Sequence, residues 1–158
     1  MKKVQDVMTR NVKPCWINDN LARAAAIMWE NDCGVVPVVN DNGNVIGMIT
    51  DRDICMAVAL KNSAPTEIIV SDIMSTNVHA CSLNDDVKDA LKTMQNARVR
   101  RIPVVGDDGR LQGILSLNDI ILQAEETRGR GVSDIPYENI VNTLKTICEH
   151  RASKAAVA

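Results

Sequence analysis

Two short stretches of the sequence pair a hydroxyl with a carboxylate three residues later. They are GMITDRDI, which holds Thr50 and Asp53, and GILSLNDI, which holds Ser116 and Asp119. The apolar residues before each pair are typical of a buried strand that runs into a helix. A hydroxyl beside the free N–H groups of a helix start suits a phosphate, and a carboxylate offers two acceptor oxygens to the adjacent hydroxyls of a ribose. Such a corner could hold a nucleotide by its sugar and its phosphate.

The same residues also have a purely structural explanation. Thr50 and Ser116 stand where a helix begins, and both residue types are good N-caps. An Asp three residues later is close to a capping box, and its charge suits the helix dipole. The S/T-x-x-D pattern is too short to decide between capping and ligand binding, so both hypotheses stay open on these residues alone.

The segment around each corner occurs twice in the chain. With a shift of 66 residues, residues 4–54 align with residues 70–120 without a gap, and about a third of the positions are identical. The openings VQDVM and VSDIM correspond, as do the strands VVPVV and RIPVV. Two repeats are too few for a solenoid, so we expect a pair that buries a shared face.

Each repeat predicts the same order of elements. A short helical turn is followed by a brief extended stretch, a helix with one apolar face, a strand, a hairpin turn, a return strand and a second helix. The second helices are expected at about 51–60 and 117–128. Pro37 and Pro103 cannot donate a ladder hydrogen bond, so each is expected at a strand start or on an edge strand.

The composition limits the classes of function. The chain has 158 residues, of which 46% are hydrophobic, and a formal net charge of -2, which is typical of a soluble globular protein. Aromatic residues make up only 2% and no basic tract stands out, so we predict no nucleic-acid partner. No apolar run approaches the ~20 residues of a membrane span and no signal peptide is recognised, so we predict a cytoplasmic protein without membrane contact.

Metal binding and catalysis have little support in the sequence. A zinc site of His79 with Cys15 or Cys81 would lack any recognised zinc spacing, and we predict no metal. The five cysteines form no C-x-x-C pair and are expected to be reduced and mostly buried. No Cys or Ser is marked by a base and an orienting group, so we do not expect an enzyme.

The repeated motifs resemble the paired cystathionine-β-synthase (CBS) domain family, often called a Bateman module. The resemblance is carried by the V-x-D-V/I-M openings, the V/I-P-V-V strands, the D-x-G hairpins and the G-x-x-T/S-x-x-D-I closings, over about residues 4–123. It implies a mixed α/β (α+β) fold of two tandem CBS repeats, each a small β-sheet with flanking helices, related by pseudo-two-fold symmetry. It also implies a non-catalytic regulatory module, commonly a homodimer, that acts on another protein whose identity the sequence does not give.

The resemblance further implies two ligand clefts between the repeats. In each cleft the Asp would bind a ribose, the hydroxyl would lie near the phosphates, and the adenine would fit against the proline-containing strand and the short first strand. The implied ligands are AMP, ADP or ATP, with S-adenosylmethionine or NAD in some members, and no obligatory cofactor. One cleft would use Thr50, Asp53, Val35, Val36, Pro37, His79 and Ala80. The other would use Ser116, Asp119, Arg100, Arg101, Ile102, Pro103, Lys13 and Pro14.

The two predicted clefts differ in charge. The second repeat has Arg100 and Arg101 where the first has a Gly and a Val. The forked donors of Arg suit a phosphate, although a solvated strand edge would explain the same residues. We therefore predict that the cleft with Asp119 is the stronger site for AMP, ADP or ATP. The cleft with Asp53 is expected to take a less anionic adenosyl ligand or to stay empty.

The predicted organisation is repeat one at 1–60, a linker at 61–67, repeat two at 68–128 and a C-terminal helix with its tail at 129–158. The C-terminal helix is expected to begin near Pro136, after a Gly-rich break. Its apolar face would fit three roles, namely covering its own repeat, dimerisation or docking on a partner. Two functions remain open. One is a sensor of an adenine nucleotide, and the other is an interaction or scaffold module with weak or vestigial nucleotide sites.

Overall fold

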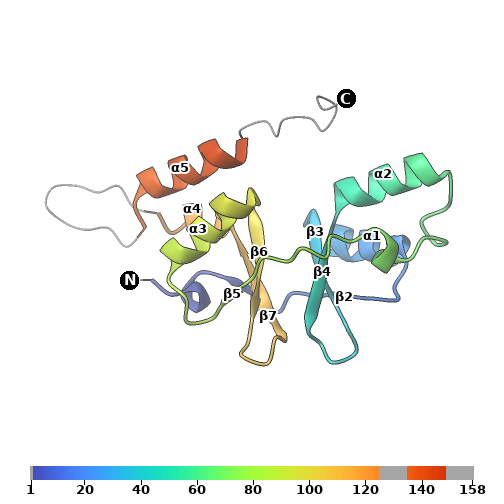
Figure 1. Cartoon of the computed structure of the whole chain (residues 1–158), viewed down its shortest axis with the longest axis horizontal. Coiled ribbons are helices and arrows are strands. Elements are labelled where there is room, and N and C mark those ends of the chain that lie inside the picture. Colours follow the sequence, from blue (N-terminus) through green and yellow to red (C-terminus); the bar gives the residue numbers. More distant parts are fainter. Residues whose placement is uncertain (1, 125–134, 149–158) are drawn as a thin grey trace, which may run out of the picture.

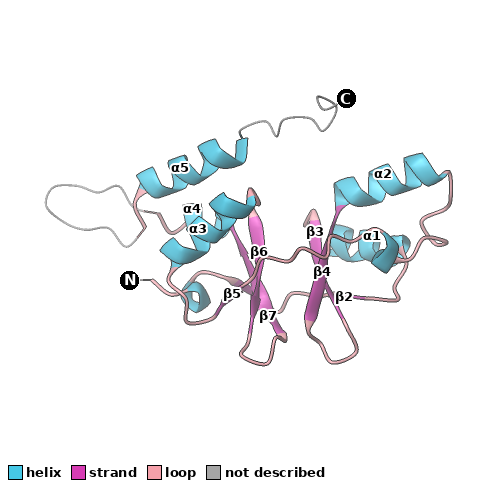
Figure 2. Ribbon diagram, viewed as in Figure 1, coloured by secondary structure: helices cyan, strands magenta, loops and turns pink. Residues whose placement is uncertain are grey.

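The computed structural model describes residues 2–124 and 135–148. Two small sheets stand next to each other, with the helices on their outer sides (Figure 1, Figure 2). One sheet has the strand order β2–β3–β4 and the other has the order β1–β7–β6–β5. This arrangement confirms the predicted mixed α/β fold of two repeats.

The elements follow the predicted order in both repeats. Repeat one has the 3-10 turn η1 (Val4–Asp6), β1 (Thr9–Arg10), β2 (Cys15–Trp16), α1 (Leu21–Glu30), β3 (Val35–Val39), β4 (Val45–Thr50) and α2 (Asp51–Lys61). Repeat two has η2 (Val70–Asp72), β5 (Cys81–Ser82), α3 (Val87–Ala97), β6 (Arg101–Val105), β7 (Leu111–Ser116) and α4 (Leu117–Ile121), and the C-terminal helix α5 spans Tyr137–Cys148.

The last helix of repeat two is shorter than predicted. It was expected at 117–128, but α4 ends at Ile121, where the N–H groups of Gln123 and Ala124 donate to carbonyls three residues back and tighten the turn. The predicted boundary at residue 128, the Gly-rich break and the C-terminal tail lie outside the described residues.

The N-terminal segment of each repeat pairs with the sheet of the other repeat. Strand β1 of repeat one pairs antiparallel with β7 of repeat two, and Ser75 of repeat two bridges Met48 of β4 through backbone hydrogen bonds of 2.9 and 3.0 Å. Gly113 permits the first crossing, because a Cβ there would lie 2.5 Å from the carbonyl oxygen of Thr9. At the second crossing, a Cβ on Gly47 would lie 2.5 Å from Met74 Sδ and 3.2 Å from the carbonyl oxygen of Ser75. The glycine of the repeated closing motif therefore gives room where the other repeat crosses, most strictly at Gly113.

The two hydrophobic cores are shared between the repeats in the same way. Val4 and Met8 pack in the core of repeat two, whereas Ile68 and Val70 pack in the core of repeat one. Val4 and Val70 are both 0% exposed. Each core needs residues from both repeats, and this exchange fixes how the two repeats sit against each other.

The two prolines occupy interior strands, so the prediction of a strand start or an edge strand is wrong. Pro37 lies in the middle of β3 and Pro103 in the middle of β6. However, β2 pairs with β3 only from Val38 on, and β5 pairs with β6 only from Val104 on. At each proline the sheet therefore has a neighbouring strand on one side only, which tolerates the missing N–H.

Helix α5 covers the helical face of repeat two, where it lies over α3 (Figure 1). It begins directly after Pro136, as predicted. Ile140 is 5% exposed within the core of repeat two, and Leu144 and Ile147 pack against that core. Within the described ranges, no helix has the length and apolar content needed to cross a membrane.

Candidate functional site

Both hydroxyl–carboxylate corners form complete capping boxes. Asp53 Oδ2 accepts hydrogen bonds from the backbone N–H and the hydroxyl of Thr50 at 2.9 and 2.7 Å, and Thr50 Oγ1 accepts from the Asp53 N–H at 3.1 Å. Ser116 and Asp119 repeat these bonds at 2.8, 2.6 and 3.2 Å. Thr50 is the N-cap of α2 and Ser116 is the N-cap of α4. The capping hypothesis is therefore confirmed at both corners.

Capping uses only one oxygen of each carboxylate, and the second oxygen differs between the two corners. Asp119 Oδ1 accepts a hydrogen bond from Thr9 Oγ1 at 3.2 Å. The counterpart of Thr9 in the repeat alignment is Ser75, and no described residue donates to Asp53 Oδ1. Capping and ligand binding are compatible at Asp53, because they would use different oxygens.

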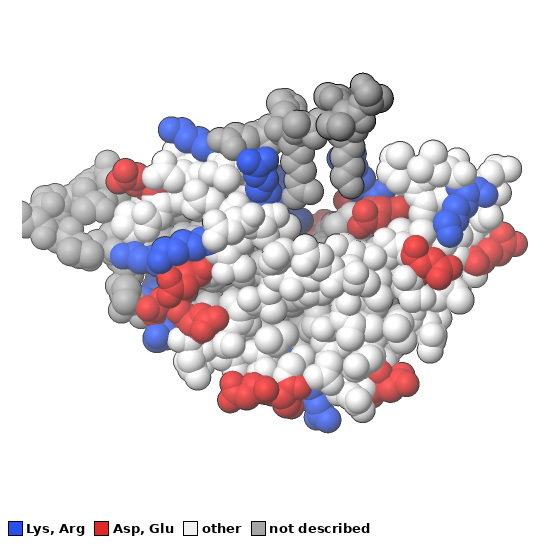
Figure 3. Space-filling view, viewed as in Figure 1, with Lys and Arg blue, Asp and Glu red and all other residues white. Residues whose placement is uncertain are grey.

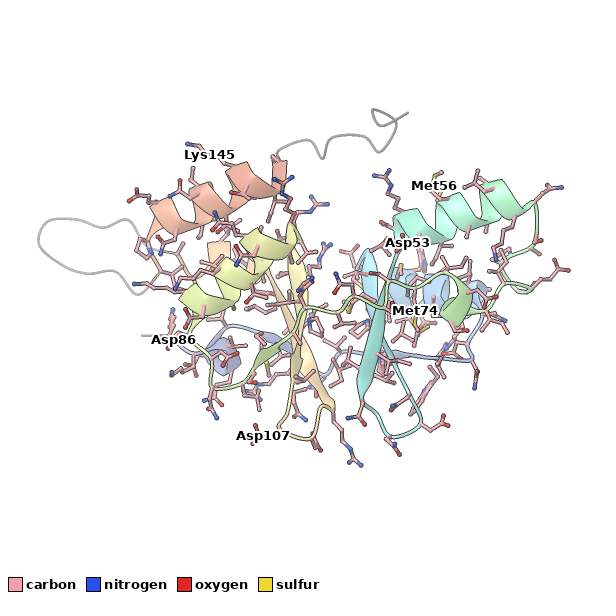
Figure 4. The ribbon with its side chains drawn as sticks, viewed as in Figure 1. Asp53, Met56, Met74, Asp86, Asp107 and Lys145 are labelled. Carbon is pink, nitrogen blue, oxygen red and sulfur yellow. The ribbon has the colours of Figure 1, made fainter. Side chains whose placement is uncertain are left out.

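The Asp53 corner opens into a cleft of about 490 Å³ between the repeats. Asp53 lies at the inner end of α2, toward repeat two (Figure 4). The volume falls within the range of roughly 300–1,000 Å³ that is usual for small-molecule sites. The cleft is lined by Val35, Met48, Thr50 and Asp53 of repeat one, by Ser75, Asn77, His79, Arg98, Val99, Arg100, Arg101 and Pro103 of repeat two, and by Ile147 and Cys148 of α5.

A second cleft of about 400 Å³ lies at the Asp119 corner. Its lining includes the N-terminal segment Thr9–Lys13 and the residues Asp32, Cys33, Val35, Arg101, Ile114, Ser116, Asn118 and Asp119. The corner of each repeat thus shares its cleft with the N-terminal segment of the other repeat, which is the cross-pairing that the resemblance implied. The exchanged segments described above produce this arrangement.

Two of the residues predicted for the Asp119 cleft line the Asp53 cleft instead. Arg101 lines both clefts, but Arg100 and Pro103 line the cleft with Asp53 and not the one with Asp119, so their predicted placement is wrong. The reason is that the loop between helix and strand faces the corner of the other repeat. The corresponding loop of repeat one, with Asp32, faces the Asp119 corner instead.

Two further predicted residues belong to the cores. Val36 is 1% exposed and Ile102 is 0% exposed, and neither side chain lines a cleft. Successive strand residues point to opposite faces of a sheet, so the clefts receive Val35 and Arg101 instead. Pro14, Pro37 and Ala80 also line neither cleft.

The sequence analysis missed several lining residues. Ser75 and Asn77 precede the predicted contact at His79 and align with Thr9 and Asn11, so the repeat alignment could have found them. Ile147 and Cys148 come from α5, which has no counterpart in the repeats, and no signal in the sequence pointed to them.

The two clefts differ in charge. Arg98, Arg100 and Arg101 line the first cleft together with the single carboxylate of Asp53. The second cleft has the cationic side chains of Arg10, Lys13 and Arg101, but it adds a second carboxylate, that of Asp32, to the carboxylate of Asp119. On the face shown in Figure 3, charged side chains lie mostly toward the edges and the centre is largely uncharged. The Asp53 cleft is therefore the better match for an anionic ligand.

The thiols near the clefts fall into two groups. Cys15 and Cys81 are 0% and 5% exposed, and burial raises the pKa of each thiol to about 12, so both stay protonated and unreactive at neutral pH. Cys33, Cys55 and Cys148 are free thiols that solvent reaches at least in part, so the prediction that the cysteines are mostly buried is wrong for these three. In the described part of the chain, no three His, Cys, Asp or Glu side chains are grouped so that they could hold a metal ion.

Comparison with known proteins gives the family. The CBS domain family model matches residues 4–60 and 70–126. CBS domain-containing protein YhcV of Bacillus subtilis is 32% identical over 142 residues, which cover 89% of this chain and 99% of that protein. The crystal structure of Hypoxic Response Protein I with two coordinated zinc ions has a TM-score of 0.70 at 28% identity, covering 77% of this chain and 98% of that one.

A third match is the CBS domain pair of protein MJ0100, whose crystal structure contains 5′-methylthioadenosine and S-adenosyl-L-methionine. It has a TM-score of 0.69 at 26% identity and covers 77% of this chain and 98% of that one. The family model matches both repeats, and the two repeats have the same fold, the same capping box and the same exchanged N-terminal segment. The chain belongs to the CBS domain family and carries two CBS domains in tandem.

Proposed function

We propose that this protein is a non-catalytic regulatory module that binds an adenosyl ligand between its CBS repeats, above all AMP, ADP or ATP. The observation that carries the proposal is the Asp53 corner, where the carboxylate lines a cleft between the repeats and keeps one oxygen that the helix cap does not use. The adenosyl ligands in the MJ0100 structure support the same ligand class.

The lining residues suggest how the parts of a nucleotide would be divided. The ribose hydroxyls would donate to Asp53 Oδ1, because an ionised carboxylate is a strong acceptor for them. Arg100 and Arg101 would bind the phosphates through their forked donors. The adenine would contact the apolar side chains of Val35 and Met48 on β3 and β4.

We propose the Asp53 cleft as the preferred site, which reverses the order expected from the sequence. Arg100 lines this cleft, and Asp53 Oδ1 accepts no hydrogen bond from a described residue. A ribose in the other cleft would compete with the Thr9 hydroxyl for Asp119 Oδ1 and would face the added negative charge of Asp32. S-adenosylmethionine, which has no phosphate, would be the alternative ligand of a cleft that rejects an anionic nucleotide, and NAD, which is less anionic than ATP, would be an intermediate case.

The scaffold hypothesis differs from this proposal in ligand affinity. A sensor must bind its ligand near the concentration at which that ligand occurs, whereas vestigial sites would bind at millimolar strength or more weakly. As a sensor, the protein would pass ligand occupancy to a regulated protein of unknown identity in the cytoplasm. A ligand can shift the packing of the two repeats only in proportion to its preference for one arrangement.

We also propose a homodimer formed through the helices of repeat one. Trp29 of α1 is 89% exposed, and Met56 and Leu60 of α2 are 46% and 77% exposed. Met56 lies on the outer side of α2 (Figure 4). Helix α5 covers the matching face of repeat two, so a second copy that pairs through the same face of repeat one would bury these side chains in an isologous contact.

Calorimetric titration with AMP, ATP, S-adenosylmethionine and NAD tests which ligand binds. The rate of thiol alkylation tests which cleft the ligand occupies. Cys148 lines the Asp53 cleft, Cys33 lines the Asp119 cleft, and Cys55 lines neither. We expect micromolar binding of an adenine nucleotide, with slower alkylation of Cys148 and an unchanged rate at Cys55. Absence of binding for all four ligands would contradict the proposal and favour the scaffold hypothesis.

A further inference from the structure

We infer that the last turn of α5 is part of the ligand site, so that ligand binding in the Asp53 cleft and docking of α5 on repeat two are coupled. The inference rests on the proposed function and goes beyond it, because it names the element through which occupancy is reported. The observation behind it is that Ile147 and Cys148 line this cleft together with Thr50 and Asp53.

Helix α5 connects the cleft to the surface of repeat two. Its first turn is anchored by Ile140 in the core of repeat two, and near its end Thr146 Oγ1 accepts a hydrogen bond of 3.1 Å from Gln95 Nε2 of α3. Lys145 lies on the outer side of the same turn (Figure 4). The turn that closes the cleft is thus held by repeat two, whereas the Asp53 corner belongs to repeat one.

The internal repeat indicates that α5 is separable from the CBS fold. In repeat two, Leu144 and Ile147 of α5 pack against the core beside α3. The corresponding groove on repeat one, lined by Met28, Trp29 and Cys55 among others, has a volume of about 550 Å³ and contains no described helix. Within one chain, repeat one forms its core without a helix of its own in this groove, so docking of α5 is an added equilibrium that a ligand can shift.

A ligand in the Asp53 cleft would contact one wall that exists only when α5 is docked. If the undocked form does not bind, a ligand at 100 times its Kd lowers the undocked population about 100-fold. If the undocked form also binds the ligand, but more weakly, saturating ligand lowers the undocked population by the ratio of the affinities of the docked and undocked forms. By reciprocity, a variant that weakens docking must weaken ligand binding by the same coupling factor. The Asp119 cleft has no described α5 residue in its lining and should be insensitive to this equilibrium.

Hydrogen exchange with AMP as the probe, repeated with ATP and S-adenosylmethionine, measures the coupling on the full chain. The informative amides are those of Ile140 and Thr143, because these residues lie in α5 but do not line the cleft, so direct shielding by a ligand does not reach them. We expect saturating ligand to slow their exchange by a factor between about 10 and 100. The Asp53→Asn variant should lose this protection together with the binding.

Variants of α5 and of its contact with α3 test the reverse direction, namely whether weaker docking of α5 weakens ligand binding. Ile147→Ala removes part of the cleft wall and should raise the Kd about tenfold, the effect of a lost apolar contact in a pocket. Gln95→Ala removes the hydrogen bond to Thr146 outside the cleft and should raise the Kd by a smaller factor. Val141→Ala is the matched control, since Val141 is 47% exposed on the same helix and its side chain lines no part of the cleft.

The outcomes separate this inference from the proposed function. Binding that depends on Asp53, with unchanged exchange at Ile140 and an unchanged Kd in Ile147→Ala, would overturn the inference and leave the proposed function in place. Binding that depends only on Asp119 would also overturn it, because α5 does not line that cleft. No binding of these three probes or of NAD would overturn the proposed function and the inference together.

Discussion

Substitution of Asp53 can separate its two roles, because each role uses a different oxygen. Asp53→Asn keeps a carbonyl oxygen that can accept both cap bonds from Thr50, but it replaces the second oxygen and the negative charge by an NH₂ group. Asp53→Ala removes the bonds that Asp53 accepts from Thr50 and the ligand contact at once, but it keeps the backbone N–H that donates to Thr50 Oγ1. Asp51→Asn is the matched control, because Asp51 carries the same charge in the same first turn and does not line the Asp53 cleft.

The expected magnitudes differ enough to be measured. Loss of the Asp53 half of the capping box in Asp53→Ala should cost an amount within the range of about 0.5–2 kcal/mol that is usual for cap substitutions, and at this chain length each kcal/mol lowers the Tm by about 2–4 °C. Asp53→Asn keeps the cap bonds and loses only the helix-dipole contribution of about 0.3–1 kcal/mol. Hydrogen bonds to a charged group contribute about 1.5–3 kcal/mol, so both Asp53 variants should bind AMP about 10- to 150-fold more weakly.

Thermal unfolding without ligand and calorimetric titration with AMP measure the two roles on the same samples. We expect Asp53→Ala to lose both stability and affinity, Asp53→Asn to lose mainly affinity, and Asp51→Asn to keep its affinity. An Asp53→Asn protein that binds AMP as tightly as the wild type would refute the ribose contact. Asp53 would then be a capping residue only.

Three further predictions concern Arg101, the buried thiols and Trp29. Arg101→Ala should weaken ATP binding about 10- to 100-fold and adenosine binding far less, because Arg101 lines both clefts and its donors suit phosphate. Equal losses of affinity in titrations with ATP and adenosine would exclude the phosphate role. Burial raises the pKa of Cys15 and Cys81 from 9.0 to about 12, so their contribution to stability is fully present below pH 9 and is lost as the pH rises from there toward 12. Urea unfolding at pH 8 and pH 10 should therefore show a smaller fall in stability for the double Cys→Ala variant than for the wild type, and equal falls would contradict the thiol assignment. Trp29→Ser should convert the dimer to a monomer in sedimentation with a stability change within about 0.5 kcal/mol, whereas a wild type that sediments as a monomer would exclude the proposed dimer.

The order of elements was predictable because the repeat gives two independent copies of each local signal. The capping boxes at Thr50 and Ser116 follow from short-range spacing, which survives in any tertiary context. The exchange of N-terminal segments was not predictable from one repeat, because Val4 carries the same apolar signal whichever core it enters. Gly47 and Gly113 were the signals for it, since a glycine inside a strand often marks a close approach of another backbone.

The cleft assignments show where a linear alignment stops being informative. The alignment places Arg100 beside the proline strand of its own repeat, but the cleft that this residue lines is closed by the corner of the other repeat. Strand alternation would have removed Val36 and Ile102 from the candidate site, because their neighbours Val35 and Arg101 point the other way. The contribution of α5 depends on a long-range contact that no repeated motif encodes.

The central claim is that the repeated corners bind an adenosyl ligand between the repeats. The most direct test is a calorimetric titration of the wild type and of the Asp53→Asn, Asp119→Asn double variant with AMP, ATP, S-adenosylmethionine and NAD, each under identical conditions. The account predicts micromolar binding to the wild type and a loss of at least about tenfold in the double variant, with folding retained. Equal binding by both proteins, or no binding by the wild type, would contradict it.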